Sequence, residues 1–343
     1  MRKVLPLLLL AGCPSVRPPP PEAPDPAQLA PPDCHPDDLD GLLHCVEPER
    51  LHAALAELAR PRPPGSAGHA AAQERCRTRL TELGYDVRVD AYEGGTNIVG
   101  RREGFKTPGQ VLAIGAHYDH LPDCPGADDN ATGVAALLEV ARVAAKARFD
   151  RTIEVACWDG GEAEQSGSAA YATTLEPETF RGAIVLESIG YADDAEGTQT
   201  IPERFDTVFP DQALEMLDHG DRGDFLTVVT DTKTEAWANR IQAHSKGAIE
   251  LHAYVLLVTD AVKAKAKKDD LYRSDHLSFW DAELPAMLLT DTGGFRNPNH
   301  HCREGRVDAP EHLSRPFFEK TTAVALVALV EGAGLRREVG PIR

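Results

Sequence analysis

The sequence predicts an α/β domain with a mixed, mostly parallel central sheet and helices on both faces. Three observations support this class. Short apolar runs alternate with amphipathic segments along the chain. The 343 residues are enough for one large core plus appendages. Charged residues make up 26% and hydrophobic residues 42%, as in a globular protein. The net charge of -18 argues against a nucleic-acid partner, because phosphate binding needs clustered Lys and Arg.

The first residues, MRKVLPLLLLAGC, have the pattern of an export signal. Arg2 and Lys3 form a charged start, and the apolar stretch 4–10 is too short to cross a bilayer. The tetrapeptide LAGC ending at Cys13 resembles the lipobox of bacterial lipoproteins. Residues 1–13 therefore predict an exported bacterial lipoprotein, anchored to a membrane at Cys13 and located in the periplasm or the outer cell envelope. A plain secretory signal is the alternative.

A tether is expected over residues 14–46, before the main domain at 47–343. The stretch from Pro14 to Pro32 is dense in proline, a composition that favours an extended chain over a packed core. Six cysteines follow Cys13, and an even number in an exported protein permits disulfides. Cys34 with Cys45 would close a short loop at the start of the domain.

Within the main domain, apolar periodicity separates helices from strands. Helices are predicted at 47–59, 70–83, 131–148 and about 315–330, the last with Ser314 as a candidate cap. Strands are predicted at 85–92, 97–101, from 111, from 152, from 182, and near 226, 251 and 285.

Acids and histidines follow these strands, where open α/β sheets place their functional sites. The candidates are His117 and Asp119 in GAHYDH, Asp128 and Asp129 in PGADDNATG, Glu162 in GGEAE, Glu187 in LESIG, and His300 and His301 in NPNHH. Each one alone has an ordinary structural explanation, such as a surface turn or a solvated strand end. Together they form the donor set of a metal site built from imidazole and carboxylate.

The segment GAHYDHLPDCPGADDNATGVAALLEVAR resembles the zinc exopeptidases of the aminopeptidase Y and bacterial leucyl aminopeptidase type. Relatives of that family include glutamate carboxypeptidase and glutaminyl cyclases. LESIGY, RSDHLSFW and LTDTGGFRNPNHH are similar to its later blocks, so the resemblance covers about 53–329. It implies a phosphorylase/hydrolase-like zinc exopeptidase fold and a peptide substrate.

The resemblance also implies two zinc ions bridged by Asp128. The other expected ligands are His117 and Glu187 on one ion, and Glu162 and His301 on the other. His301 fits the family position better than its neighbour His300. The Asp128–Asp129 peptide is expected to be cis, as in the family.

Further residues are expected around the metal ligands. Asp119 is two residues after His117 and on the same side of a strand, where it would orient the imidazole. Asp275 and His276 lie near the substrate in the family, although a helix-capping role for Ser274 and Asp275 is equally compatible with the sequence.

The family resemblance also brings Cys124 near Cys302, which suggests a disulfide clamping the metal loops. The family continues with an Asp-Thr pair four and five residues after its last histidine. Here these positions are Gly305 and Arg306, which predicts weaker support for His301.

The main departure from the family is in CWDGGEAEQSGSAAY. Aligned on Gly167 and Ser168, the general-base glutamate of the family is replaced by Gly161, and Glu162 keeps the position of the ligand. A general base contributes about 100- to 10,000-fold to the rate. Asp159 and Glu164 are possible substitutes for it, and a shift that makes Glu162 the base and Glu164 the ligand is a third possibility.

The leading prediction is a zinc aminopeptidase that removes amino-terminal residues from peptides. The first alternative is a peptidase-like protein that binds metal without turnover, because Gly161 cannot transfer a proton. The second alternative is a glutaminyl cyclase, which uses one zinc ion.

Overall fold

The structure, a computed structural model, describes residues 34–266 and 273–336. These residues belong to one of two units in the chain, Asp33–Arg343. The predicted export signal, Cys13 and the proline-rich stretch lie outside the described residues. None of the helices in the described part of the chain is long and apolar enough to cross a bilayer.

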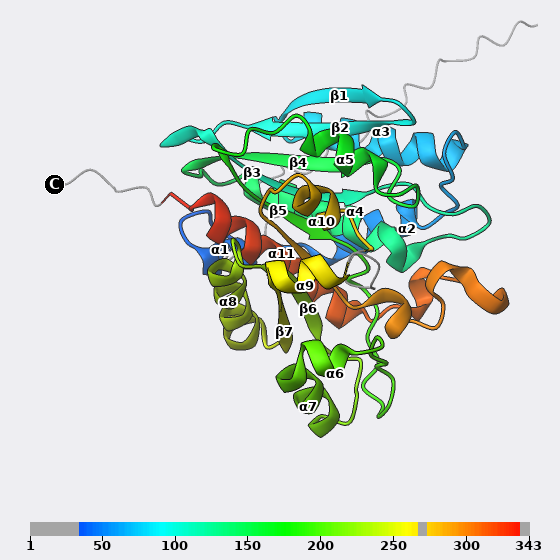
Figure 1. Cartoon of the computed structure of the whole chain (residues 1–343). Coiled ribbons are helices and arrows are strands. Elements are labelled where there is room, and N and C mark those ends of the chain that lie inside the picture. Colours follow the sequence, from blue (N-terminus) through cyan, green and yellow to red (C-terminus); the bar gives the residue numbers. More distant parts are fainter. Residues whose placement is uncertain (1–33, 267–272, 337–343) are drawn as a thin grey trace, which may run out of the picture. The chain divides into compact units, whose positions relative to one another are not determined.

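Eight strands form one mixed sheet in the order β1-β2-β4-β3-β5-β8-β6-β7 (Figure 1). The strands are β1 (Asp86–Tyr92), β2 (Gly95–Arg102), β3 (Thr107–His117), β4 (Arg151–Trp158), β5 (Phe180–Leu186), β6 (Leu226–Asp231), β7 (Ala253–Val258) and β8 (Ala286–Thr290). The neighbours β4, β3, β5 and β8 are parallel to one another. β2 is antiparallel to β4, and β6 is antiparallel to β8. The predicted fold class is confirmed.

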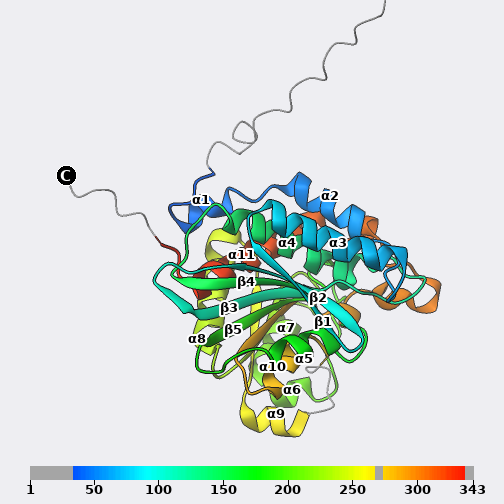
Figure 2. The same cartoon turned by 90° about the horizontal axis from the view of Figure 1, so that it is seen from above.

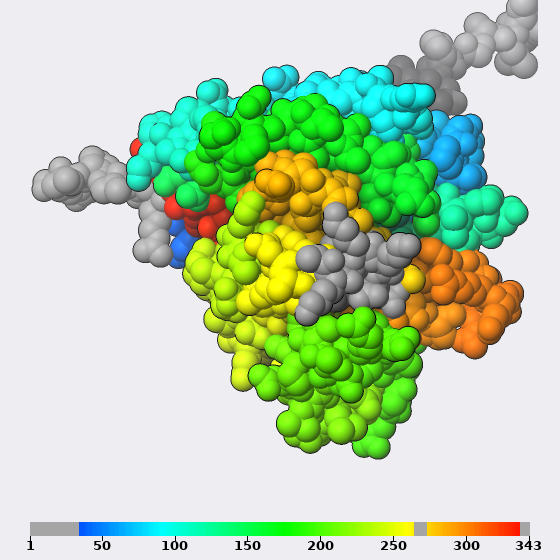
Figure 3. All heavy atoms as spheres, in the orientation of Figure 1, coloured from blue at the N-terminus to red at the C-terminus, as the bar shows by residue number. Residues whose placement is uncertain are grey.

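Helices cover both faces of the sheet (Figures 1 and 2). One face carries α1 (Leu39–Leu43), α2 (Pro48–Leu58), α3 (Ala67–Glu82), α4 (Gly133–Ala144), α8 (Glu235–His244) and α11 (Arg315–Ala333). The other carries α5 (Ser166–Ala172), α6 (Phe205–Val208), α7 (Pro210–Asp218), α9 (Asp260–Ala266) and α10 (His276–Asp281). Figure 3 shows the face of the molecule on which α6, α7, α9 and α10 lie.

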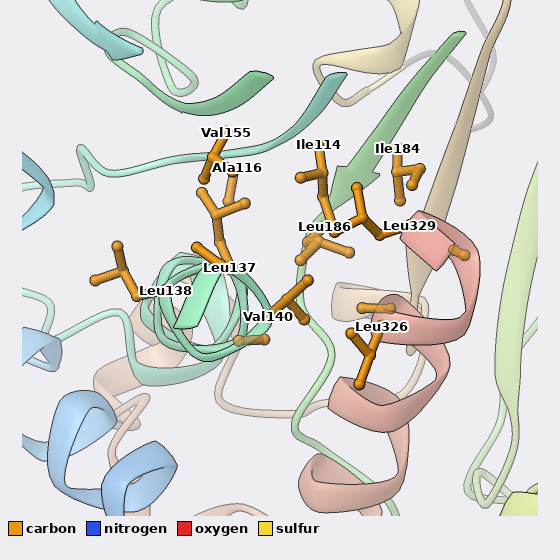
Figure 4. Close-up of a cluster of buried hydrophobic side chains, with 14 of the residues drawn as sticks. Ile114, Ala116, Leu137, Leu138, Val140, Val155, Ile184, Leu186, Leu326 and Leu329 are labelled. Atoms are coloured by element: carbon orange, nitrogen blue, oxygen red, sulfur yellow. The ribbon is translucent and has the colours of Figure 1, made fainter. Parts of the chain in front are cut away.

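The larger core lies between the sheet and the helices α4 and α11 (Figure 4). Leu137 and Val140 of α4 and Leu329 of α11 are buried with Ile114 and Leu186 of the strands. Each such side chain contributes about 1.5–3 kcal/mol by leaving water. This packing fixes the start of α4 beside the carboxyl ends of β3 and β5.

The predicted strands and the four predicted helices are present, with shifted boundaries. The helix expected at 131–148 is shorter at both ends, because α4 spans Gly133–Ala144. Before it, Ala127–Thr132 form an irregular turn in which Asp129 and Asn130 have non-helical backbone angles. Ser314 precedes α11 but makes no side-chain capping bond. No helix was predicted from the sequence over α5 to α10.

Among the described residues, three disulfides are present: Cys34–Cys45, Cys76–Cys157 and Cys124–Cys302. The first and third pairs are those expected from the sequence. The unexpected pair joins α3 to β4. Cys124–Cys302 joins the loop after β3 to the loop after β8, and both of these loops carry candidate metal ligands.

Candidate metal centre

The loops at the carboxyl ends of β3, β4, β5 and β8 bring the candidate ligands together. His117 is the last residue of β3, Glu187 directly follows β5, and Glu162 lies in the turn after β4. His301 comes from the loop after β8, and Asp129 from the turn before α4. Because the four strands are parallel, their carboxyl ends share one edge of the sheet, which is where such folds place their sites.

Asp129 lies between two groups of donors. On one side, the Nε2 atom of His117 is 3.3 Å from Asp129 Oδ1 and 3.8 Å from Glu187 Oε2. On the other side, His301 Nε2 is 2.8 Å from Asp129 Oδ2 and 3.6 Å from Glu162 Oε1. A carboxylate placed in this way has one oxygen for each of two neighbouring cations.

His300 also approaches Asp129, but from further away. Its Nδ1 atom is 3.5 Å from Asp129 Oδ2, and its ring stacks on the ring of His301 with centroids 3.9 Å apart. Burial lowers the pKa of His300 to about 4. The shorter distance favours His301 as the ligand, and the choice between the two histidines stays a prediction.

Several buried donor atoms of this cluster have no hydrogen-bond partner within the described residues. They include Nδ1 of His117, both ring nitrogens of His120, Asp129 Oδ1 and Glu162 Oε1. A buried polar atom left without a partner costs about 1–3 kcal/mol. Imidazole nitrogens and carboxylate oxygens in such a cluster are the donors that zinc prefers, so the residues present fit a zinc centre.

The sequence-based choice of Asp128 as the shared ligand is not supported by the structure. Asp128 Oδ1 accepts a hydrogen bond from the backbone N–H of Gly190 at 3.0 Å, and Oδ2 accepts one from Asn297 Nδ2 at 2.9 Å. Its carboxylate therefore ties loops together, and the candidate metal groups contain Asp129 instead. The cis peptide is also one residue later than expected, between Asp129 and Asn130.

Asp119 lies beside the His117 ring, on the side of Nδ1, as expected for a residue that orients this imidazole. Its Oδ1 atom is 3.3 Å from Nδ1 of His117. The same carboxylate accepts hydrogen bonds from the backbone N–H groups of Gly161 at 2.8 Å and Glu162 at 3.2 Å. Asp119 thus positions both a candidate ligand on β3 and the turn after β4.

Charges in the cluster depend strongly on one another. Burial lowers the pKa of His117, but Asp119, Asp129 and Glu187 outweigh burial and raise the pKa well above its ordinary value. Burial raises the pKa of Glu187, and the nearby His117 partly offsets this rise. For Asp129, the nearby His117 and the hydrogen bond with His301 outweigh burial and hold the pKa well below its usual range. The carboxylates of the cluster thus stabilise positively charged groups, such as protonated His117, beside them.

The turn that contains Gly161 packs directly on His117. A Cβ atom at position 161 would lie 2.1 Å from Cγ of the His117 ring, closer than any real contact. The absence of a side chain at this position is therefore part of how the turn fits the site.

The two residues considered as substitutes for the general base lie away from the cluster. Asp159 follows the end of β4, and its carboxylate accepts hydrogen bonds from Tyr118 Oη at 3.0 Å and from the backbone of Thr96 at 3.0 Å. It also lies 2.7 Å from Nε2 of His69. Glu164 is exposed in the turn and belongs to none of the candidate metal groups.

Asp275 and His276 lie fully buried at the start of α10. Asp275 makes no side-chain capping bond, and neither of its carboxylate oxygens has a hydrogen-bond partner within the described residues. The preceding residue, Ser274, donates a hydrogen bond to Glu187 Oε2. Burial raises the pKa of Asp275 to about 7, with His117 opposing and Glu187 adding to the shift. The helix-capping explanation for Asp275 is therefore wrong.

Sequence reasoning missed Asp308. Its carboxylate accepts hydrogen bonds from the backbone N–H groups of Asp128 at 3.0 Å and Asp129 at 3.2 Å. Gly305 and Arg306 were expected to weaken the support of His301. Further along the same loop, the buried Asp308 supports the turn that contains Asp129. The sequence signal was an acid near the end of this loop, further from His301 than the positions Gly305 and Arg306 that were considered.

His120 was also missed, although it stands three residues after His117. Its ring is buried, and its Nδ1 atom lies 2.8 Å from Glu162 Oε1. The only sequence signal was a second histidine in GAHYDH.

A cavity of about 380 Å³ opens beside the cluster. Glu187, Ser274, His300 and Arg303 line it near the candidate ligands. Its apolar lining consists of Ile201, Pro202, Phe205, Met216, Val229, Leu256, Leu288 and Phe295. The arrangement provides an apolar binding space next to a metal-binding cluster.

Carboxylate and imidazole donors clustered at the strand ends of an α/β sheet are typical of metal-dependent hydrolytic enzymes. Within this class, the chain belongs to peptidase family M28, whose profile matches residues 97–329. The family resemblance expected from the sequence motifs is thereby confirmed.

Individual relatives agree with this assignment. The chain is 32% identical to the uncharacterized protein YfbL of Escherichia coli over 206 residues, 56% of this chain and 59% of YfbL. It is also 32% identical to the aminopeptidase YwaD of Bacillus subtilis over 118 residues, 33% of this chain and 26% of YwaD. The chain thus spans less than two thirds of these relatives. The structure of the LapA aminopeptidase of Legionella pneumophila has the same fold, with a TM-score of 0.64 and 16% identity over 88% of this chain and 76% of LapA.

Proposed function

We propose that this protein is an exported zinc aminopeptidase that binds two zinc ions. The observation that carries the proposal is Asp129, whose two carboxylate oxygens face separate donor groups. His117 and Glu187 would hold one ion, Glu162 and His301 would hold the other, and Asp129 would contribute to both. When bound, zinc supplies polarisation of the scissile carbonyl and activation of a water molecule.

The substrate is a peptide with an apolar amino-terminal residue. The cavity beside Glu187 has an apolar lining that includes Phe205, Met216 and Leu256. Each methylene of a substrate side chain buried there contributes about 0.8 kcal/mol to binding. Leucine, methionine and phenylalanine are therefore favoured over alanine, aspartate and lysine at the amino terminus.

Asp275 is the residue that takes over the proton transfer for which Gly161 has no side chain. It is a buried carboxyl group whose two oxygens lack hydrogen-bond partners in the described part of the chain. Its electrostatic neighbours include His117, Glu187 and Asp119. Asp275 accepts a proton from the attacking water and returns it to the leaving amine, so its charge is restored after each cycle.

Export and lipid attachment at Cys13 form a further part of the proposal. They rest on the charged and apolar start of the chain and on the sequence LAGC. The three disulfides support an oxidising compartment, such as the bacterial periplasm.

The decisive test combines zinc content with hydrolysis. The full mature protein is loaded with zinc and assayed on a panel of aminoacyl peptides, with amino-terminally acetylated peptides as controls. We expect about two zinc ions per chain, release of apolar amino-terminal residues and no cleavage of the blocked peptides. Cyclisation of an amino-terminal glutamine with a single bound zinc would instead indicate a glutaminyl cyclase.

A second candidate function is peptide binding without turnover. The replacement of the general base by Gly161 favours it, because this position has no group that can move a proton. Two bound zinc ions, peptide binding by calorimetry and no product after long incubation would support the binding function and overturn the aminopeptidase.

A further inference from the structure

His120 is a buried histidine whose position ordinary packing does not explain. Its side chain is fully buried, and neither ring nitrogen has a hydrogen-bond partner among the described residues. Nδ1 lies 2.8 Å from Glu162 Oε1, yet that oxygen is also without a hydrogen-bond partner. The two atoms are close without being aligned for a hydrogen bond. This arrangement is typical of two ligand atoms that bind the same metal ion.

The donors around His120 belong to the metal-binding cluster. Ligand atoms of His120, Asp129 and Glu162 all lie within 4.8 Å of one another. The ring of His120 lies 5.9 Å, centroid to centroid, from the ring of His301. His301 in turn approaches Asp129 and Glu162 at 2.8 and 3.6 Å. Four donor side chains therefore lie together here: His120, Asp129, Glu162 and His301.

The surrounding backbone holds the imidazole in this position. The backbone N–H of His120 donates to the carbonyl of Arg62 at 3.1 Å. The buried guanidinium of Arg62 donates to the carbonyls of Tyr118 at 2.9 Å and Gly126 at 3.0 Å, on either side of His120. A Cβ atom at position 126 would lie 2.3 Å from Cδ2 of the His120 ring. Glycine at position 126 thus makes room for this ring.

We infer that His120 is a fourth protein ligand of the zinc ion held by Asp129, Glu162 and His301. This inference rests on the proposed dinuclear zinc centre and adds a residue to it. Four protein ligands complete the usual coordination of a structural zinc, whereas catalytic zinc keeps a position open. With His120 as a ligand, the Glu162 side would have four protein donors and no open position, so the side formed by His117 and Glu187 would be the one to receive the scissile bond.

The test measures zinc affinity rather than activity. Full mature protein is stripped of metal and titrated with zinc in competition with a chromophoric chelator. Wild type, His120→Asn and His120→Ala are compared. Asparagine places an amide N–H near the position of Nδ1, so it can still donate to Glu162 but is a poor zinc ligand. We expect both variants to lose about 100-fold or more in affinity at one site, with the other site unchanged.

X-ray absorption at the zinc edge counts the imidazole ligands directly. With two ions bound, we expect three imidazoles in wild type and two in either variant. His52→Asn is the matched control, because His52 is a largely buried histidine that contacts Glu319 at 2.7 Å, outside the metal groups. It should leave both zinc affinities and the imidazole count unchanged.

The outcomes separate this inference from the proposed function. If His120→Asn keeps wild-type affinity while His120→Ala loses it, His120 only donates a hydrogen bond to Glu162 and the inference is wrong. If both variants bind two zinc ions as wild type does, the inference also fails, but the dinuclear centre stands. A wild-type protein that binds no zinc would instead overturn the proposed function.

Discussion

The carboxylate of Asp308 accepts a hydrogen bond from the backbone N–H of Asp129 at 3.2 Å, across 179 residues of sequence. Asp128 donates to the same carboxylate at 3.0 Å. Asp308 therefore stabilises the turn that contains Asp129, the proposed shared metal ligand, through the backbone N–H groups of that turn. Replacing it leaves two buried N–H groups without an acceptor, at about 1–3 kcal/mol each.

We expect Asp308→Ala to lower the free energy of unfolding by about 2–4 kcal/mol and to weaken zinc binding about 10- to 100-fold. Urea unfolding in the presence of chelator measures the first effect, and zinc competition measures the second. Glu311→Ala, an exposed change in the same loop, is the control. Equal zinc affinities in the two variants would show that Asp308 does not position Asp129.

The turn after β4 leads to a prediction about Gly161. Since a Cβ atom at this position would collide with the His117 ring at 2.1 Å, Gly161→Ala must displace the ring or the turn. We expect a loss of about 1–3 kcal/mol in stability together with weaker zinc binding. Gly109→Ala is the control, because a Cβ atom there has no neighbour within 4 Å.

The same collision predicts that Gly161→Glu fails to restore a general base. Activity of this variant should be at or below that of wild type on every aminoacyl substrate. A large gain in kcat would contradict this expectation. It would mean that the turn rearranges and that the missing glutamate alone limits the enzyme.

Much of the site followed from the sequence, because strand ends are visible in the apolar pattern. His117, Glu162 and Glu187 each follow such a run and lie in the cluster. The choice between Asp128 and Asp129 did not follow from the sequence, since adjacent residues in an irregular turn point in different directions. Only the backbone angles of the turn decide which carboxylate faces the histidines.

Other residues were missed because loops have no fixed periodicity. Asp308 reaches the turn that presents Asp129 from a loop whose path the sequence did not reveal. His120 lies beyond the end of β3, where strand alternation no longer tells which way a side chain points. The family spacing was a good guide on the strands and a poor one in the loops.

The Cys124–Cys302 disulfide should matter more for metal binding than the one near the amino terminus. Cys302 is adjacent to His301, and Cys124 lies in the loop that leads to Asp129. Removing such a cross-link costs about 2–4 kcal/mol of stability. We expect Cys302→Ser to weaken zinc binding, as measured by chelator competition. Cys34→Ser, which opens the separate Cys34–Cys45 link, should leave zinc affinity unchanged.

The buried pair Asp128 and Asp291 predicts a pH dependence of the metal-free protein. Burial and the charge of Asp291 raise the pKa of Asp128 well above its ordinary value. Burial raises the pKa of Asp291 to about 6. The folded state therefore keeps protons that the unfolded chain has released above about pH 4.

Because the folded state binds more protons, the free energy of unfolding of the metal-free protein should fall as pH rises from about 4 to 6. The expected fall is on the order of 2 kcal/mol, measured by urea unfolding in chelator. Asp291→Asn removes one of the two charges and should flatten this slope. A slope equal to that of wild type would show that the pair does not carry the effect.

The proposed role of Asp275 leads to the most direct prediction about turnover. Asp275→Asn keeps the size of the side chain but cannot accept a proton. We expect kcat to fall about 100- to 10,000-fold, with zinc content and KM close to wild type. Asp281→Asn, an exposed change at the other end of α10, is the control.

The pH profile separates proton transfer from a purely structural role. Burial raises the pKa of Asp275 to about 7 in the metal-free protein, and a carboxyl group accepts a proton only when it is ionised. In wild type, kcat should rise with pH through this region, and the acidic limb should be absent from the residual activity of Asp275→Asn. If the variant keeps both its turnover and the acidic limb, another group moves the proton and the assignment of Asp275 is wrong.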